Sequence, residues 1–470
     1  MSEKQDKSDH YLPSSRFWLL GPAYAPPACW QHICLSALLL ILILFGVIVE
    51  IRSAFLKRHM TDLGVYLRAA WAVRVGEDPY TVTDDNGWHY HYPTLFAILM
   101  VPFADPPAGT DRAGMLPFWL IVALWYVFSI VCLVFAVHAL ASALEQTSND
   151  PAVRALPRGC RRWWALRLLP VLACLLSIGH TLARGQVNLL LLLLLSGMIA
   201  ALLRGRSWQA GFWLAGAICL KIIPALLLIY PLWRRDRRCL AACALGLVVG
   251  LVVMPSLVFG PARNWAYFQE WDQALRQPAL QGQGDNSRAK ELINVTATDS
   301  QSFQAILHNT TNLDRYTRPA APETWVRIAH WVIGGLLLSA MFLLAGRGQL
   351  SPSRETIFLG GLVLMMMLLS PVCHLHYFCL LVPLVMGLIT VTWDQESSAL
   401  VRISFWTLLA VNVVANVLPL IPGLEILRDV GLVTYAALAL RLAGMAWLPK
   451  RSSVKTVGGV GQSSVRGAAA

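Results

Sequence analysis

The residues best suited to chemistry in this chain stand at the ends of long apolar segments. The acid among them is Asp62, which follows shortly after the first such segment. The others are cations, amides, a hydroxyl and two histidines: Arg184, Gln186, Asn188, Lys221, Gln301, Ser302, His374 and His376. A carboxylate can accept a proton from a hydroxyl group as a bond forms, and cations can stabilise a departing phosphate. These residue types therefore suit a transfer reaction between a lipid-borne phosphate and a polar acceptor.

Several of these candidates also have a purely structural explanation. Asp62 could be the N-cap of a helix predicted over 63–75. Lys221 could extend its charge to the lipid headgroups, and Gln186 and Asn188 could satisfy a helix start. We favour a functional role for Asp62 because cations and aromatic residues surround it in the sequence.

The histidine pair raises the question of a metal. His374 and His376 are two residues apart, so they would share one face of an extended segment. A third ligand is not visible beside them, and two histidines are weak evidence for a metal site. We therefore predict no metal site and no cofactor, and the sequence leaves dependence on a divalent metal open.

An aromatic stretch follows Asp62 and is dense in tyrosine, histidine and tryptophan from Tyr80 to Tyr92. Such side chains stack on sugar rings, and they also populate membrane–water boundaries. Both interpretations place this stretch at an interface. The residues predicted to bind the sugar or acceptor are Tyr66, Tyr80, His91, Tyr92, Gln301 and Ser302.

Composition identifies a membrane protein. The chain has 470 residues, of which 56% are hydrophobic and 14% are charged. Soluble domains carry roughly a quarter charged residues, and repeated apolar runs of about 20 residues are transmembrane helices. The net charge of +12 lies largely in short loops, so it indicates topology rather than nucleic-acid binding. The cysteines are scattered without paired spacing, which gives no sign of a disulfide framework.

We predict an all-α polytopic protein with about twelve transmembrane or re-entrant helices in one domain over 32–447. The segments are near 32–51, 116–142, 166–182, 188–203, 209–220, 222–233, 239–259, 325–345, 355–371, 377–392, 402–421 and 429–447. Arginine-rich loops alternate along the chain, which predicts cytoplasmic tails at 1–31 and 448–470. Outer loops then fall at about 52–115 and 260–324, and the candidate residues all gather at that outer end.

The segment 209–233 is unusual because arginines flank both of its ends. Both ends then lie on the same side of the membrane, so an even number of membrane crossings must fit into this short segment. Two half-length helices that meet at Lys221 and Pro224 satisfy this requirement. Broken helices inside a membrane commonly line a site, which favours phosphate binding by Lys221.

The chain resembles glycosyltransferase family 87, the bacterial polyprenyl-phosphate-sugar-dependent, mannosyltransferase-like proteins of the GT-C superfamily. The matching pieces occur in family order across about 60–380: Asp62 with Tyr66, Gly76 to Tyr80, His91 to Pro93, Gly185 to Asn188, Ala210 to Pro224, Gln301 with Ser302, and Ser370 to Tyr377. The family often shows S-P-x-S-W-x-H-H where this chain has Ser370-Pro-Val-Cys-His-Leu-His-Tyr. The altered spacing leaves open which histidine takes the family role.

The resemblance implies a GT-C-type fold and an integral-membrane enzyme of the cell (inner) membrane, with its active site facing outside. It implies transfer of a hexose, mannose being expected, from a polyprenyl-phosphate donor to a hydroxyl on a lipid or glycan acceptor. Asp62 would be the general base, and Lys221, Arg184 or one histidine would neutralise the leaving phosphate. One displacement inverts the anomeric configuration, and we find no second carboxylate for a double displacement.

Two other functions compete with this prediction. A carrier or flippase of lipid-linked sugars would use the same groove without chemistry, but it predicts midplane charges and internal symmetry that we do not find. A relative that glycosylates proteins usually has paired acids in the first outer loop, whereas Asp62 is followed by Leu63. Asp84 and Asp85 form a pair, but they lie far beyond the end of the first helix.

Overall fold

The computed structural model describes residues 29–273, 291, 299–393, 398–446 and 448. Within these residues the chain is helical, with two isolated β-bridges at Thr83–His89 and Ser300–His374. The all-α expectation is therefore confirmed. The predicted cytoplasmic tails lie almost wholly outside the described residues.

The first half of the chain supplies the helices on which most candidate residues lie. These are α1 (Cys29–Glu50), η2 (Ile51–Leu56), α2 (Thr61–Val75), α3 (Thr94–Met100), η3 (Val101–Phe103), α4 (Phe118–Thr147), α5 (Arg161–Ala173), α6 (Leu175–Arg184), α7 (Asn188–Leu203), α8 (Ser207–Leu220), η4 (Ile223–Leu228) and α9 (Ile229–Arg234). Here η2 is a π-helical turn, and η3 and η4 are 3₁₀ turns.

The second half completes the bundle and adds α15 beside the histidine pair. Its elements are α10 (Arg237–Leu247), the π-helical η5 (Val248–Val253), α11 (Met254–Phe259), α12 (Pro261–Trp271), α15 (Phe303–Thr311), α16 (Thr324–Ala345), α17 (Pro352–Leu369), η7 (Leu375–Leu381), α18 (Val382–Thr392), α19 (Ala399–Val417), η8 (Leu418–Leu420), α20 (Ile426–Asp429) and α21 (Leu432–Met445).

Seven helices among the described residues are long and apolar enough to cross a membrane, and the bent pair α5–α6 raises the number to eight. The bend between α5 and α6 is 63°. Shorter apolar helices occupy other predicted segments, among them Asn188–Leu203, Ile223–Arg234 and Leu432–Met445. A helix therefore forms at every predicted segment, although length and composition do not establish twelve crossings.

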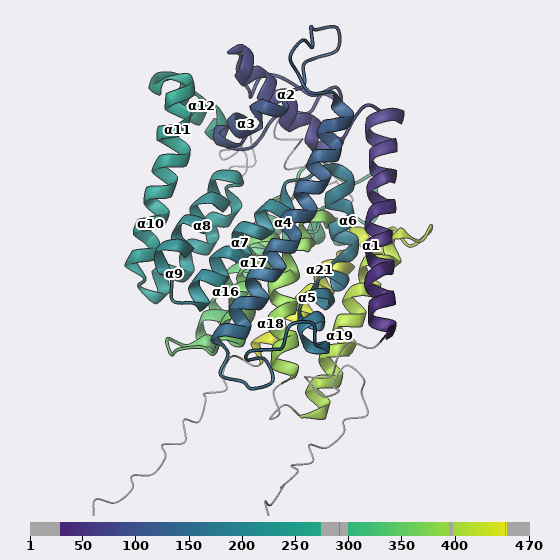
Figure 1. Ribbon diagram of the computed structural model, residues 1–470, viewed down its shortest axis with the longest axis vertical. Coiled ribbons are helices and arrows are strands. Elements are labelled where there is room, and N and C mark those ends of the chain that lie inside the picture. Colours follow the sequence, from purple (N-terminus) through teal and green to yellow (C-terminus); the bar gives the residue numbers. More distant parts are fainter. Residues whose placement is uncertain (1–28, 274–290, 292–298, 394–397, 447, 449–470) are drawn as a thin grey trace, which may run out of the picture.

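The helices divide into a buried centre and a lipid-exposed rim. In the most apolar window of Leu375–Thr392, 94% of the residues are buried, whereas only 6% are in that of His32–Leu56. Figure 1 shows α1 at one side of the bundle and α10 with α11 at the opposite side. A helix that is apolar all round packs either in a core or against lipid, and the chain uses both solutions.

The arginine-rich loops meet at one end of the bundle. The Arg204 Nε donates to Gln146 Oε1 at 2.8 Å, and the Arg234 Nη1 donates to the Gly348 carbonyl at 2.7 Å. The guanidinium of Arg162 lies 5.4 Å from the ring centroid of Trp393. These contacts connect five loops, in two groups, at this end, while α2, α3 and α12 lie across the other (Figure 1).

The predicted break in 209–233 is present. α8 ends at Leu220, and Lys221 has an extended backbone with φ −145° and ψ 128°. The chain then re-enters helical geometry as η4 and α9, with Pro224 in the first turn of η4. Lys221 therefore stands at the tip of two half-length helices, at the same end of the bundle as α2.

The interpretation of Asp62 as a helix N-cap is wrong. α2 begins at Thr61, its N-cap is Met60, and Asp62 lies in the first turn. The predicted end is correct, because Gly76 forms the C-cap with a positive φ of 80°. Asp62 benefits from the positive end of the helix dipole, but it does not supply the capping hydrogen bond.

Candidate active site

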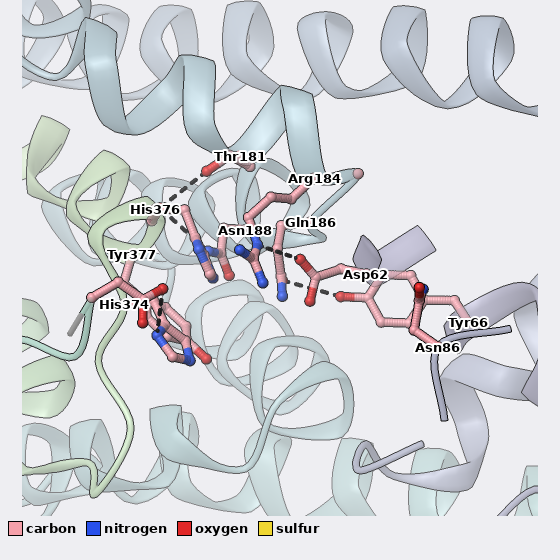
Figure 2. Close-up of polar contacts among 12 residues, drawn as sticks. Asp62, Tyr66, Asn86, Thr181, Arg184, Gln186, Asn188, His374, His376 and Tyr377 are labelled. Atoms are coloured by element: carbon pink, nitrogen blue, oxygen red, sulfur yellow. Dashed lines mark hydrogen bonds and ion pairs between the residues drawn. The ribbon is translucent and has the colours of Figure 1, made fainter. Parts of the chain in front are cut away.

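Asp62 is paired with Arg184 across two helices. The Nε of Arg184, the last residue of α6, donates to Asp62 Oδ2 at 2.8 Å, as Figure 2 shows. The side chains are 20% and 36% exposed for Asp62 and Arg184 respectively. Asp62 Oδ1 has no partner among the residues that the structure describes. The sequence placed other cations around Asp62, but Arg52, Lys57 and Arg58 are exposed and its partner is Arg184.

Gly185 explains how α6 approaches α2 so closely. It ends α6 with φ 69°, a left-handed conformation that favours glycine. A Cβ at this position would lie 2.7 Å from Leu63 Cβ and 2.9 Å from Met60 Sδ. The carbonyl of Gly185 also accepts a hydrogen bond from Trp125 Nε1 at 2.9 Å. The absence of a side chain therefore allows the turn to pack against the start of α2.

Two tyrosines and an amide form a hydrogen-bonded group beside this pair. The Tyr66 hydroxyl lies 3.1 Å from both Gln186 Oε1 and the Tyr92 hydroxyl, and Gln186 Nε2 lies 3.4 Å from the Tyr92 hydroxyl. Burial raises the pKa of both phenols, well above the usual value for Tyr66 and to about 12 for Tyr92. Both hydroxyls therefore stay neutral and can hydrogen-bond sugar hydroxyls without acting as bases.

Lys221 is a buried cation held by neutral partners. Its Nζ donates to Asn188 Oδ1 at 2.9 Å and to the Tyr377 hydroxyl at 3.0 Å. Nζ also lies 4.1 Å from the centroid of the Tyr377 ring and 5.4 Å from that of Tyr92. Lys221 is 7% exposed, and no carboxylate among the described residues pairs with it. A buried charge without an opposite charge is costly, so this position favours an anionic ligand.

The two histidines occupy different environments. His376 is 2% exposed, and its backbone carbonyl accepts from Thr181 Oγ1 at 3.0 Å and from Asn188 Nδ2 at 3.3 Å. The His374 ring is partly exposed, and its Nδ1 lies 3.1 Å from Asp299 Oδ2. The two rings are 5.3 Å apart between centroids. Sequence reasoning missed Asp299, although it stands only two residues before Gln301.

Gln301 and Ser302 are fully buried and make contacts that hold the start of α15 in place. Ser302 Oγ caps α15 by accepting from the Ala305 amide at 3.1 Å, and it donates to the Pro371 carbonyl at 3.3 Å. Gln301 Nε2 donates to the Arg428 carbonyl at 2.7 Å. These contacts fix the backbone next to the histidine pair, and a direct contact of either side chain with sugar stays a prediction.

Tyr80 and His91 lie beside Tyr92 rather than at the Asp62–Arg184 pair. The Tyr80 hydroxyl donates to the Tyr92 carbonyl at 3.0 Å, and Tyr80 is 4% exposed. His91 Nε2 lies 2.9 Å from Glu291 Oε2, which also accepts from the His89 amide. The structure thus brings Tyr66 and Tyr92 to the pair, while contact of Tyr80 and His91 with sugar stays a prediction.

The acidic pair Asp84 and Asp85, in the loop between α2 and α3, has structural partners. Asp85 Oδ1 accepts from Arg68 Nη2 at 2.6 Å. Asp84 Oδ1 accepts from the amides of Asn86 at 3.0 Å and Trp88 at 2.8 Å, which closes the loop on itself. Neither contact involves Asp62. Across the described residues, no group of three or more His, Cys, Asp or Glu side chains could hold a metal ion.

The site therefore combines three parts at one end of the bundle. Asp62 has one oxygen without a partner among the described residues, and two buried phenols and an amide lie beside it. Lys221 is buried close to the Tyr92 ring and has no acidic partner among the same residues. The first part can accept a proton, the second can orient hydroxyl groups, and the third can bind an anion.

Comparison with known proteins agrees with these features. The model of glycosyltransferase family 87 matches residues 90–371, which is more than half of the chain. A polyprenol-phosphate-mannose-dependent alpha-(1-2)-phosphatidylinositol mannoside mannosyltransferase of Mycobacterium tuberculosis is 26% identical over 326 residues. That alignment covers 67% of this chain and 65% of the relative, so the chain spans less than two thirds of the relative's length.

Two solved structures of ArnT from Cupriavidus metallidurans are also similar. One is bound to undecaprenyl phosphate, with a TM-score of 0.37 and 14% identity, and the other is in the apo state, with a TM-score of 0.38 and 13% identity. Each comparison covers 88% of this chain and 78% of the ArnT chain.

Proposed function

The chain belongs to glycosyltransferase family 87, and on that premise we propose that it transfers a hexose from a polyprenyl-phosphate donor to a hydroxyl group. We propose mannose as the hexose, and a lipid or a glycan carried by the membrane as the acceptor. The relative's printed name, with its polyprenol-phosphate-mannose donor and lipid-linked acceptor, supports both choices. The reaction proposed here needs no cofactor.

In the proposed step, the acceptor oxygen bonds to the anomeric carbon as the bond from that carbon to the donor phosphate oxygen breaks. Asp62 accepts the hydroxyl proton through Oδ1, because Oδ2 is bound by Arg184. The electron pair of the broken bond leaves on the polyprenyl phosphate, whose charge Lys221 and Arg184 stabilise. One displacement inverts the configuration at the anomeric carbon.

One observation carries this proposal: Lys221 is buried without an acidic partner in the described residues, at the same end of the bundle as Asp62. A structural lysine at this depth would be expected to pair with a carboxylate. Neutral partners hold its amine in place, and burial lowers the pKa of Lys221 to about 7, so a bound anion would stabilise its charged form. A phosphate supplies the missing charge, and Asp62 supplies the proton acceptor that a hydroxyl acceptor requires.

We further propose that the site faces the outside of the cell membrane. The arginine-rich loops share the opposite end of the bundle, and short basic loops are retained in the cytoplasm. A polyprenyl phosphate released on the outer side would then stay in the membrane, and its phosphate would leave the site laterally.

The test uses purified protein in lipid nanodiscs with a panel of polyprenyl-phosphate hexoses and candidate lipid acceptors. We expect acceptor-dependent release of polyprenyl phosphate, with the largest rate for the mannose donor and an anomeric configuration in the product opposite to that of the donor. Addition of a chelator tests metal dependence in the same assay. Transport of intact donor across the bilayer without any transfer would show instead a carrier of lipid-linked sugars.

A further inference from the structure

The segment before α15 places an acid beside the histidine pair. Ser300 pairs with His374 in an antiparallel bridge, and the amide of Gln301 donates to the Cys373 carbonyl at 2.5 Å. This short pairing brings Asp299 Oδ2 to 3.1 Å from His374 Nδ1. The distance is that of an ion pair, but the contact does not have the geometry of a hydrogen bond. The neighbouring backbone thus fixes where the carboxylate lies.

The other charged groups around the two histidines are mainly cations. Arg184 and His180 act on His376 from α6 and Lys221 acts on it from the end of α8, while Arg428 of α20 lies near His180. Among the described residues, the carboxylate of Asp62 is already paired with Arg184. A protonated imidazole would be repelled by these cations. The Asp299 carboxylate is the group that offsets this repulsion at His374.

Asp299 is ionised at neutral pH. Burial raises its pKa, but the contact with His374 and the positive charge of His374 and Arg184 lower it more, to about 2. His376 has no such partner, because its ring contacts no carboxylate among the described residues and its Nε2 is buried without a hydrogen bond. A second proton there would add a charge among Arg184, Lys221 and His374 without compensation.

We propose that Asp299 is a positioning residue, which fixes the His374 ring and supplies the negative charge beside it so that His374, rather than His376, binds the donor phosphate. This inference rests on the proposed function and assigns the histidine that the sequence left open. An imidazolium with Nδ1 at a carboxylate directs its Nε2–H to another acceptor. His374 is partly exposed and can reach a ligand, whereas Asp299 itself does not touch the donor.

The test follows binding of a polyprenyl phosphate and the transfer rate from about pH 5.5 to about pH 8.5, the range in which a histidine titrates. For Asp299→Asn we expect the pH at which binding falls by half to move down by about one unit. At about pH 7.5 the Kd then rises about tenfold, and at about pH 5.5 it stays near that of the wild type. Asp299→Glu should recover most of the binding.

Two further variants separate the histidines. His374→Gln should bind weakly at every pH and lose the pH dependence, whereas His376→Gln should keep it. The matched control is Asp314→Asn, which makes the same substitution at an exposed carboxylate in the segment after α15. It should follow the wild-type curve, and thermal unfolding of every variant checks that the protein is folded.

The inference is overturned if Asp299→Asn follows the wild-type pH curve, or if it weakens binding equally at all pH values as a merely structural acid would. It is also overturned if His376→Gln is the variant that loses the pH dependence. If the expected pH shifts appear in binding but no donor gives transfer, the assignment of His374 stands and the proposed glycosyltransferase activity fails.

Discussion

The substitution Asp62→Asn tests the enzyme assignment most directly. It keeps the size of the side chain and removes the charge and the basic oxygen. α2 does not depend on Asp62 for its N-cap, so the helix should form as before. If Asp62 is the general base, kcat should fall by about 10² to 10⁴, the usual contribution of a positioned base. Donor affinity should change little, because Asp62 does not contact the phosphate in the proposed mechanism.

A structural role for Asp62 gives a different magnitude. The Asp62–Arg184 pair joins two partly exposed side chains at 2.8 Å. Such pairs contribute about 0.2–1 kcal/mol to stability, and their loss does not by itself slow a chemical step a hundredfold. A small loss of stability with normal turnover would therefore identify Asp62 as an anchor for α6 and not as a base.

The assay measures initial rates of sugar transfer at saturating donor, together with donor Kd and thermal unfolding. The matched control is Asp85→Asn, which breaks the 2.6 Å pair with Arg68 on the same helix and loop. Its turnover should stay near that of the wild type. Near-normal kcat for Asp62→Asn would refute the assignment. An equal loss in both variants would show that α2 and the loop after it are only structurally sensitive.

Three further outcomes follow from the structure. Lys221→Met should raise the donor Kd or KM at least about tenfold, while thermal stability stays near that of the wild type, since a buried charge is removed together with its hydrogen bonds. A variant that aggregates but keeps full activity in its folded fraction would show that the lysine is structural. Gly185→Ala should lower the free energy of unfolding by about 2–5 kcal/mol, because the strain of a positive φ adds to a clash with α2. Gly76→Ala should lower it by about 1–2 kcal/mol, for strain alone. Equal losses for the two variants in unfolding measurements would contradict this reasoning. In a cysteine-free background, Asn86→Cys should react with an impermeant thiol reagent outside intact cells and Gly348→Cys only after lysis, and the reverse pattern would invert the topology.

Much of the architecture could be predicted because membrane helices are specified locally. An apolar run, its flanking arginines and a glycine or proline at its end suffice to place α4, α16 or α19. The break at Lys221 was predicted in the same way, from the short length of the apolar segment and the arginines at both of its ends. The prediction that the candidate residues gather at one end of the bundle came from the alternation of arginine-rich loops along the chain. The loop contacts of Arg204, Arg234 and Arg162 agree with that prediction.

The pairing within the site could not be predicted, because it depends on contacts between distant segments. Asp62 and Arg184 are 122 positions apart, and no periodic pattern connects them. The sequence instead favoured the cations nearest to Asp62 along the chain. Asp299 was missed for a similar reason, since a single acid in a polar loop is distinguished only by the bridge between Ser300 and His374.

The position of Arg184 suggests how proton removal and phosphate departure could be coupled. Its Nε donates to Asp62 Oδ2, and its Nη groups have no partner among the residues that the structure describes. The same guanidinium can therefore orient the base and reach toward the phosphate. If Asp62 is the base and Arg184 binds the donor phosphate, the charge that the phosphate gains on departure would draw Arg184 away from Asp62 at the moment when the hydroxyl proton must leave.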